Sequence, residues 1–175
     1  MKIYTKSGDN GFTSLHSGER VRKDNLFIEI IGELDELNSH IGYLISMIDH
    51  SQDEDFLHFL QNILFDLSTC LCDEQYSLDG QCSLIEREID LIQSELPLLH
   101  SFILPGGCQI AAQAHICRSV CRRVERRVVS SLDNCSVSDS SIRILNRISD
   151  YFYVFARKVN FERSIVEKKW QKTCK

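Results

Sequence analysis

The stretch AHICRSVCRRVERRVV, residues 114–129, holds five arginines and one glutamate among residues typical of a helix core. Each residue turns an α-helix by about 100°, so the position of every side chain around the helix follows from the sequence. One sector is apolar, and it holds Ile110, Ala114, Cys117, Cys121, Val124 and Val128. The stretch therefore predicts a helix, from about residue 109 to about residue 131, that buries one face in a larger core.

The arginines of this helix divide between two sides. Arg118 and Arg122 border the apolar sector together with Glu125, where a guanidinium without a partner is costly to bury. We predict that they bind a specific anion or a buried carboxylate. Arg123 and Arg127 point further from the core, and for them we predict a solvated face. Candidate carboxylates stand near the start of the first helix, where they also complement its dipole: Glu33, Asp35 and Glu36.

Other parts of the chain show the same helical periodicity, with apolar residues recurring every three or four positions. The expected helices cover about residues 26–48, 56–71, 83–96, 109–131 and 141–163. Asp79–Gly80 should break the chain, and Ser83 with Glu86 forms a capping box typical of a helix start. Because no repeat or linker divides these helices, they predict an all-α protein folded as one five-helix bundle.

This pattern predicts a single domain over residues 1–175. Residues 1–25 would form an N-terminal loop, residues 26–163 the helical bundle and residues 164–175 a C-terminal tail. The net charge is −5, whereas a general nucleic-acid binder would more often be basic. No basic-then-apolar pattern typical of a leader precedes residue 30, and no apolar run approaches the roughly 20 residues that span a bilayer. We therefore expect a cytoplasmic protein without nucleic-acid or membrane partners.

The eight cysteines predict neither a disulfide framework nor a metal site. Cys70 and Cys72 are separated by one residue, and Cys117 and Cys121 lie one turn apart on the same helix. None of these pairs has the C-x-x-C spacing of zinc knuckles and redox motifs. Reduced thiols that act as small core residues are expected instead.

A second polar stripe is expected on the last helix. It consists of Asn146, Asp150, Tyr153 and Arg157, opposite the apolar residues Leu145, Ile148, Phe152, Phe155 and Val159. Asn146 and Asp150 have poor helix propensity, so their presence favours a site over a plain wet surface. His115, in contrast, is expected to be a core or surface histidine whose hydrogen bonds are satisfied.

The N-terminal segment TKSGDNGFTS, residues 5–14, is rich in glycines and hydroxyls and carries one lysine. Glycines let backbone N–H groups approach an anion closely. The segment is not a P-loop, because G-x-x-x-x-G-K-[ST] is absent. Together with Lys23 and the arginine-rich helix predicted over about residues 109–131 (the arginine helix), it predicts a polyphosphate held between a loop and a helix face.

Six segments, in this order along the chain, closely resemble the PduO-type ATP:cob(I)alamin adenosyltransferases. They are YTKSGDNGFTSL (4–15), GERVRKD (18–24), GELDELNSHIG (32–42), FILPGG (102–107), the stretch at 114–129 and LNRISDYFYVFAR (145–157). The resemblance runs from Tyr4 to about Asn160. Six segments in order are far more specific than any one of them.

The resemblance implies a ferritin-like, cobalamin adenosyltransferase-like five-helix bundle with an N-terminal ATP-binding loop, assembled as a homotrimer with active sites between subunits. It implies that Co(I) of cob(I)alamin directly attacks the ribose C5′ of ATP, giving adenosylcobalamin and triphosphate. ATP and cobalamin would be substrates and Mg²⁺ a cofactor, with a reductase and an adenosylcobalamin-dependent enzyme as further candidate partners. The arginine helix would then stabilise the charge of the leaving triphosphate.

By this resemblance, the ATP contacts are Thr5, Lys6, Ser7, Gly8, Asp9, Gly11, Lys23, Arg122, Glu125 and Asn146. Asp35 and Arg118 match a carboxylate–arginine pair between subunits, and with Arg122 and Glu125 they are the candidate catalytic residues. Phe102 matches the aromatic residue that excludes the lower ligand of cobalamin, whereas by itself it would be a hydrophobic plug after Pro97. No side chain is assigned as a metal ligand.

The chain departs from the family pattern at two places. Ser7 stands where the family usually has threonine, which keeps the hydroxyl group. The tail VEKKWQKTCK, residues 166–175, matches no firm motif, and its Trp170 is a candidate cover for the cobalamin pocket.

Three other classes of protein share some of these sequence features. The same bundle could hold ATP or adenosylcobalamin as a sensor or delivery chaperone, but Lys6, Arg122, Glu125 and Asn146 are all present, which favours turnover. A ferritin-like di-iron protein would need two Glu-x-x-His motifs, and the sequence has none. A nucleic-acid binder is disfavoured by the acidic balance and by the lack of aromatic residues among the arginines.

Overall fold

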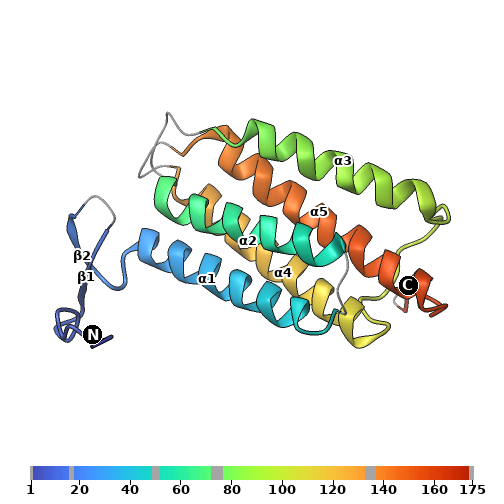
Figure 1. Ribbon diagram of the computed structural model, residues 1–175, viewed down its shortest axis with the longest axis horizontal. Coiled ribbons are helices and arrows are strands. Elements are labelled where there is room, and N and C mark those ends of the chain that lie inside the picture. The colour runs from blue at the N-terminus through green and yellow to red at the C-terminus, as the bar shows by residue number, and fades with distance from the viewer. Residues whose placement is uncertain (1, 16–17, 49–51, 72–76, 133–136, 174–175) are drawn as a thin grey trace.

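The computed structural model describes residues 2–15, 18–48, 52–71, 77–132 and 137–173. Its elements are β1 (Phe12–Ser14), β2 (Arg20–Arg22), α1 (Leu26–Ile45), α2 (Gln52–Cys70), α3 (Asp79–Glu95), α4 (Gln109–Ser130) and α5 (Asp139–Glu162). The five helices lie side by side as a bundle, which confirms the predicted fold class (Figure 1). Within the described ranges, no helix combines the length and the apolar character needed to cross a membrane.

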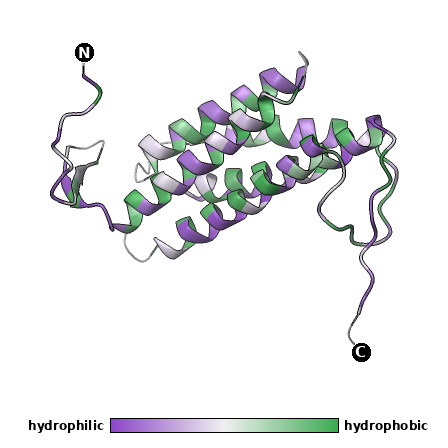
Figure 2. Cartoon of the chain, turned by 90° about the horizontal axis from the view of Figure 1, so that it is seen from below, coloured by the Kyte–Doolittle hydropathy of each residue, from purple (hydrophilic) through white to green (hydrophobic). Residues whose placement is uncertain are grey.

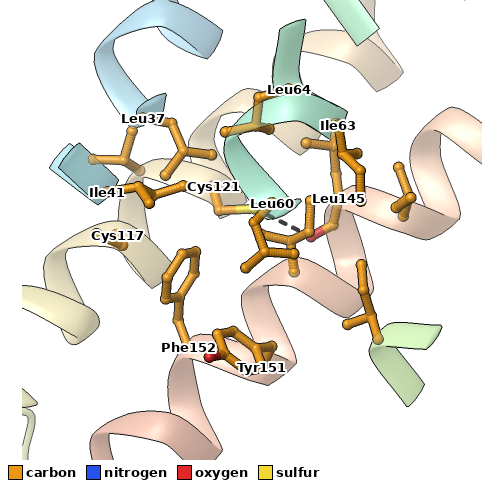
Figure 3. Packing of buried hydrophobic residues seen from close by; sticks show 14 of the residues in the cluster. Leu37, Ile41, Leu60, Ile63, Leu64, Cys117, Cys121, Leu145, Tyr151 and Phe152 are labelled. Carbon is orange, nitrogen blue, oxygen red and sulfur yellow. Dashed lines mark hydrogen bonds between the residues drawn. The ribbon is translucent and has the colours of Figure 1, made fainter. Parts of the chain in front are cut away.

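The core lies where α1, α2, α4 and α5 meet (Figure 3). Every residue of the predicted apolar sector of α4 is at most 5% exposed, and the same holds for the predicted apolar side of α5. Between these two helices, the Cys121 thiol donates to the carbonyl oxygen of Leu145 at 3.1 Å (Figure 3). Each large aliphatic side chain buried in this way contributes about 1.5–3 kcal/mol, so the two apolar stripes are a main source of stability.

Core thiols are also found as predicted. Cys82, Cys117 and Cys121 are free and buried. Burial raises the pKa of Cys117 to about 12 and raises that of Cys121 well above its usual value, so both thiols stay protonated. They act as small apolar side chains, whereas Cys72 and the side chain of Cys70 lie outside the described part of the chain.

A ladder of ion pairs joins α4 to α1. The Arg123 Nε atom lies 3.7 Å from Glu33, and its Nη2 atom contacts Glu36. Arg127 lies 3.5 Å from Glu33 and 3.8 Å from Glu29, so the two helices run antiparallel. Arg123 and Arg127 remain partly exposed to solvent, as predicted, but helical angles did not show that α1 would supply carboxylate partners for them.

Helix α3 begins before the predicted capping box. Ser83 lies inside the helix, where its hydroxyl donates to the carbonyl oxygen of Asp79 at 3.2 Å, and Asp79–Gly80 forms the first turn instead of a break. The preceding residue, Leu78, is fully buried, and its N–H donates to the Ser140 hydroxyl at 3.2 Å. Anchoring of Leu78 against the start of α5 therefore overrides the local capping signal.

The predicted N-terminal loop contains a short antiparallel hairpin that the sequence pattern did not reveal. β1 pairs with β2 so that Phe12 faces Arg22, and Gly18 adopts a φ of +86° in the connection. The hairpin lies beyond the bundle at the end where α1 begins. Both the α3–α4 connection and the C-terminal tail lie at the opposite end (Figures 1 and 2). The N-terminal hairpin and the C-terminal tail thus lie at opposite ends of the bundle.

Candidate active site

Arg122, Glu125 and Asn146 lie together on the α4–α5 pair. The Asn146 amide donates to Glu125 Oε1 at 3.1 Å, and both side chains are half-buried, whereas Arg122 is exposed. Asp150 belongs to the same cluster. The pKa of its carboxyl is raised, because the effect of burial outweighs the opposing effect of the Arg147 and Arg122 guanidiniums. The cluster presents cations, carboxylates and an amide at the surface, a combination suited to phosphate groups and a phosphate-bound metal ion.

The N-terminal loop is shaped by local contacts around its glycines and hydroxyls. The hydroxyls of Thr5 and Ser7 are 2.8 Å apart, and Lys6 between them has a φ of +62°, which is uncommon for a residue other than glycine. Lys23 lies over Gly8, where a Cβ atom would come within 3.2 Å of the ammonium nitrogen. The glycine at this position therefore lets a cation approach the loop backbone.

The rest of the loop is tied to the hairpin. The Lys23 N–H donates to the carbonyl oxygen of Gly11 at 2.9 Å, and Gly11 adopts a φ of +79°. Arg20 donates to the carbonyl oxygen of Ser7 at 3.0 Å. Asp9 is exposed. The loop thus gathers cations and hydroxyls on one short segment, in a form that an anion can reach.

The loop and the helix cluster do not meet within one chain. Among the described residues, no hydrogen bond or ion pair joins residues 5–11 to Arg122, Glu125 or Asn146. Figures 1 and 2 show the hairpin projecting away from the helices. The sequence-predicted ATP contacts therefore form two separate surfaces on the chain.

Asp35 and Arg118 are likewise apart. Asp35 is exposed and lines a groove between α1 and α2, next to Phe65. Arg118 lines a different cavity, and its buried Nε atom has no hydrogen-bond partner within the described part of the chain. The partner that the sequence predicts for Arg118 is therefore not supplied by the described residues of the same chain.

A cavity of about 900 Å³ opens between the α3–α4 connection, the tail and the sides of α4 and α5. Phe102, His115, Tyr153 and Trp170 line it together with Arg118. Phe102 is 78% exposed, so the alternative in which it plugs the core after Pro97 is wrong. Its ring meets that of Trp170 edge to face, with the ring centres 6.4 Å apart.

The C-terminal tail is held against the connection before α4. The Trp170 N–H donates to the carbonyl oxygen of Phe102 at 2.8 Å. Arg157, which is 7% exposed, donates to the carbonyl oxygen of Pro97 at 2.9 Å and lies 3.4 Å from Glu167. Trp170 therefore lies at the edge of the cavity that contains Phe102, although no family motif covers the tail.

His115 is buried without the hydrogen bonds that were expected of it. Neither ring nitrogen has a partner among the described residues, and the ring is 5% exposed beside Tyr153. Burial, and secondarily the charge of Arg118, lowers its pKa from 6.5 to about 4. The imidazole is therefore neutral at neutral pH, and the expectation of a satisfied histidine was wrong.

Two polar residues near the cluster were missed by the sequence reasoning. Arg147 donates through Nε to Glu86 at 2.7 Å and through Nη1 to Asn146 at 2.9 Å. Arg147 lies inside a segment already singled out, but neither helical angle nor spacing showed that α3 would supply Glu86. The signal for such a pair is the packing of α3 on α5, which only the fold reveals.

Comparison with known proteins gives a consistent result. The cobalamin adenosyltransferase family model matches residues 3–159. A cobalamin adenosyltransferase from Cupriavidus metallidurans is 42% identical over 98% of this chain and 95% of its own length. A corrinoid adenosyltransferase from Bacillus subtilis is 38% identical over 99% of this chain and 94% of its own.

Solved structures agree with these relatives. A variant PduO-type ATP:corrinoid adenosyltransferase from Lactobacillus reuteri, complexed with cobalamin and ATP, superimposes with a TM-score of 0.91 at 31% identity. The match covers 98% of this chain and 97% of that protein. Since sequence and structure agree over nearly the whole length, this chain belongs to the cobalamin adenosyltransferase family.

Proposed function

We propose that this protein is an ATP:corrinoid adenosyltransferase, which transfers the 5′-deoxyadenosyl group of ATP to cob(I)alamin. One observation carries the proposal. In this member of the family, the cluster of Arg122, Glu125 and Asn146 is suited to bind phosphate groups, and the same chain has a cavity of about 900 Å³ lined by Phe102. The Lactobacillus reuteri neighbour holds ATP and cobalamin together, which supports two ligands of this kind.

The chain's own residues would bind ATP mainly through its phosphates. The proposed contacts are Thr5, Lys6, Ser7, Gly8, Asp9, Gly11 and Lys23 from the loop, and Arg122, Glu125 and Asn146 from the helices. Lys6, Lys23 and Arg122 supply positive charge, and the loop supplies hydroxyl and backbone N–H donors. Binding between these two surfaces would immobilise the triphosphate while leaving the ribose C5′ free to react.

The transfer itself needs no nucleophile from the protein. The electron pair of Co(I) forms the new Co–C5′ bond, the bond between C5′ and the triphosphate oxygen breaks, and its electrons leave with triphosphate. Negative charge therefore grows on the leaving group, where Arg122 and Lys6 would stabilise it. This role would explain why α4 is rich in arginine.

Mg²⁺ fits the donors of the cluster. It prefers oxygen ligands and usually binds through one or two carboxylates together with substrate phosphates. Glu125 and Asp150 offer carboxylates beside Arg122, so Glu125 is the proposed protein contact of a phosphate-bound Mg²⁺. Bound there, Mg²⁺ would supply further positive charge to the leaving triphosphate.

Cobalamin would occupy the cavity with its lower face against Phe102. The exposed ring of Phe102 would exclude a lower cobalt ligand, and Trp170 would cover the pocket beside it. Loss of the lower ligand makes Co(II) easier to reduce, so the cavity would also help a reductase partner deliver the electron. An adenosylcobalamin-dependent enzyme is the proposed recipient of the product.

We also propose that residues 1–175 act as one domain in a homotrimer, with each active site between two subunits. The ATP loop lies at one end of the bundle and the α3–α4 connection, which lines the cavity with Phe102, lies at the other, which supports a site completed by a neighbour (Figures 1 and 2). Asp35 of one subunit would meet Arg118 of the next. This pairing would satisfy the guanidinium whose Nε atom has no partner among the described residues.

The decisive test is an anaerobic assay with ATP, Mg²⁺ and chemically reduced cobalamin. The corrinoid absorbance and the triphosphate released are followed together. Adenosylcobalamin formed with an equal amount of triphosphate is the expected result. Binding of ATP and cobalamin without either product would instead identify a sensor or delivery protein.

A further inference from the structure

Asn146 is the middle link of a hydrogen-bond chain that crosses three helices. Glu86 of α3 accepts from Arg147 Nε at 2.7 Å, and Arg147 Nη1 donates to Asn146 Oδ1 at 2.9 Å. Asn146 Nδ2 in turn donates to Glu125 Oε1 on α4 at 3.1 Å. This series of hydrogen bonds therefore begins at Glu86, which is not a proposed ATP contact, and ends at Glu125, which is one.

The chemistry of its two neighbours decides how the Asn146 amide is turned. A guanidinium can only donate hydrogen bonds, and an ionised carboxylate can only accept them. The amide oxygen must therefore face Arg147, and the NH₂ group must face Glu125. Turning the amide around would set its oxygen against the Glu125 carboxylate and its NH₂ group against the guanidinium.

Glu86 is what keeps Arg147 in place. Besides its contact with Glu86, the guanidinium lies 3.5 Å from Asp150, a member of the same cluster. Glu86 stands on a different helix, so it draws the guanidinium across the α3–α5 contact and fixes the Nη1 atom beside Asn146. Without Glu86, the guanidinium would keep, among the described residues, only the contacts of Nη1 with Asp150 and Asn146 on its own helix, so it would be free to turn relative to the amide.

We infer that Glu86 and Arg147 are positioning residues for ATP, because they hold the amide of Asn146, and through it Glu125, in the orientation that receives the nucleotide. The inference rests on the proposed assignment of Asn146 and Glu125 to the ATP site. Neither Glu86 nor Arg147 needs to touch ATP for this role.

The same two helices provide a matched control. Arg143 of α5 lies 3.2 Å from Asp79 of α3, one helical turn before the Arg147–Glu86 pair. Both pairs join the same helices at partly exposed positions, but among the described residues no hydrogen bond links the Arg143–Asp79 pair to Asn146. A purely structural role for such pairs predicts equal effects from both arginines.

The test compares Arg147→Met with Arg143→Met in the full-length protein. Methionine keeps an apolar stem and removes the donors. The loss of a charge-assisted hydrogen bond should raise the KM for ATP about tenfold in Arg147→Met, with a much smaller change in kcat and in the KM for cobalamin. Both variants should lose similar, small amounts of thermal stability, and Arg143→Met should keep the wild-type KM.

Double variants show whether Arg147 acts through Asn146. If it does, adding Arg147→Met to Asn146→Ala should raise the KM for ATP no further, because the amide to be oriented is already gone. Glu86→Gln, which keeps an acceptor but loses the charge, should raise the KM less than Glu86→Ala. This milder pair also tests the inference if Arg147→Met does not fold.

The possible failures are distinct. Equal KM values in Arg147→Met and Arg143→Met, or additive effects in the double variant, would overturn the positioning role. An unchanged KM in Asn146→Ala would instead overturn the assignment of Asn146 to the ATP site. A wild-type protein that forms no adenosylcobalamin would overturn the proposed function itself.

Discussion

At the scale of single residues, Arg122 offers the most direct test of the proposed chemistry, because its side chain is exposed and its removal should leave the fold intact. Loss of one group that stabilises charge in a transition state typically lowers kcat by about 10²–10³-fold, and we expect Arg122→Ala to fall in this range. The measurement is the rate of adenosylcobalamin formation under saturating ATP. Arg127→Ala is the matched control on the same helix, since its guanidinium pairs with α1 and should leave kcat unchanged.

Arg118 and Arg123 show what residue spacing can and cannot predict. Spacing correctly placed the apolar face of α4 and correctly singled out Arg118 as a guanidinium in need of a partner. It did not show the ion-pair partners of Arg123, which depend on which part of α1 packs beside it. It failed for His115, because the number of hydrogen bonds at a buried position depends on neighbours from other helices.

His115 should make the stability of the protein depend on pH. Its pKa is lowered from 6.5 to about 4 in the folded state, so the unfolded chain binds more protons between these values. The contribution of the neutral ring is therefore fully present above pH 6.5 and is lost as the pH falls toward 4. Between neutral pH and a pH of about 4.5, this loss amounts to about 2 kcal/mol.

Urea unfolding of the wild type and His115→Phe at both pH values measures this contribution. Changes in packing alter the stability of the variant at both pH values, so the relevant quantity is the stability that each protein loses on acidification. The wild type should lose about 2 kcal/mol more than the variant. Equal losses would show that the histidine titrates normally in the folded protein.

At the scale of elements, the helices were predictable, whereas the contacts that the irregular segments make were not. Periodicity over twenty or so residues identifies a helix because many side chains repeat the same signal. The pairing of Trp170 with Phe102 joins two short segments far apart in the chain, and neither has a period to detect. The start of α3 shows the same limit, since burial of Leu78 outweighed a good local cap.

The segment that carries Phe102 should affect one step of the reaction more than the others. If its ring excludes the lower cobalt ligand, Phe102→Ala should impair turnover from Co(II) with a coupled reductant far more than turnover from prereduced Co(I). Both rates are followed by the corrinoid spectrum. Leu98→Ala is a control in the same connection, because Leu98 is 85% exposed and does not line the cavity. Equal losses from both cobalt states would exclude this role for Phe102.

At the scale of the whole molecule, the sequence alone did not predict which surfaces lie at which end of the bundle. Residue types predicted a polyphosphate held by a loop and a helix face, but they did not show that the loop projects from one end of the bundle while the α3–α4 connection, which lines the cavity with Phe102, lies at the other (Figures 1 and 2). A heterologous contact, in which two different surfaces of identical chains meet, would bring the loop of one chain to the cavity side of the next. Such contacts form a closed ring when the rotation between neighbouring chains closes. Asp35 and Arg118 are also separate within one chain, because they line different hollows.

Mixed oligomers test this arrangement. Asp35→Ala and Arg118→Ala should each be nearly inactive, because every interface then lacks one member of the proposed pair. When the two variants are coexpressed with different affinity tags and purified through both, some interfaces combine the intact Arg118 of one chain with the intact Asp35 of the other. Every trimer that carries both tags has one intact interface out of three, so activity should return to about a third of the wild type. If both residues served a site within one chain, every chain would still carry a defect and mixing would restore nothing.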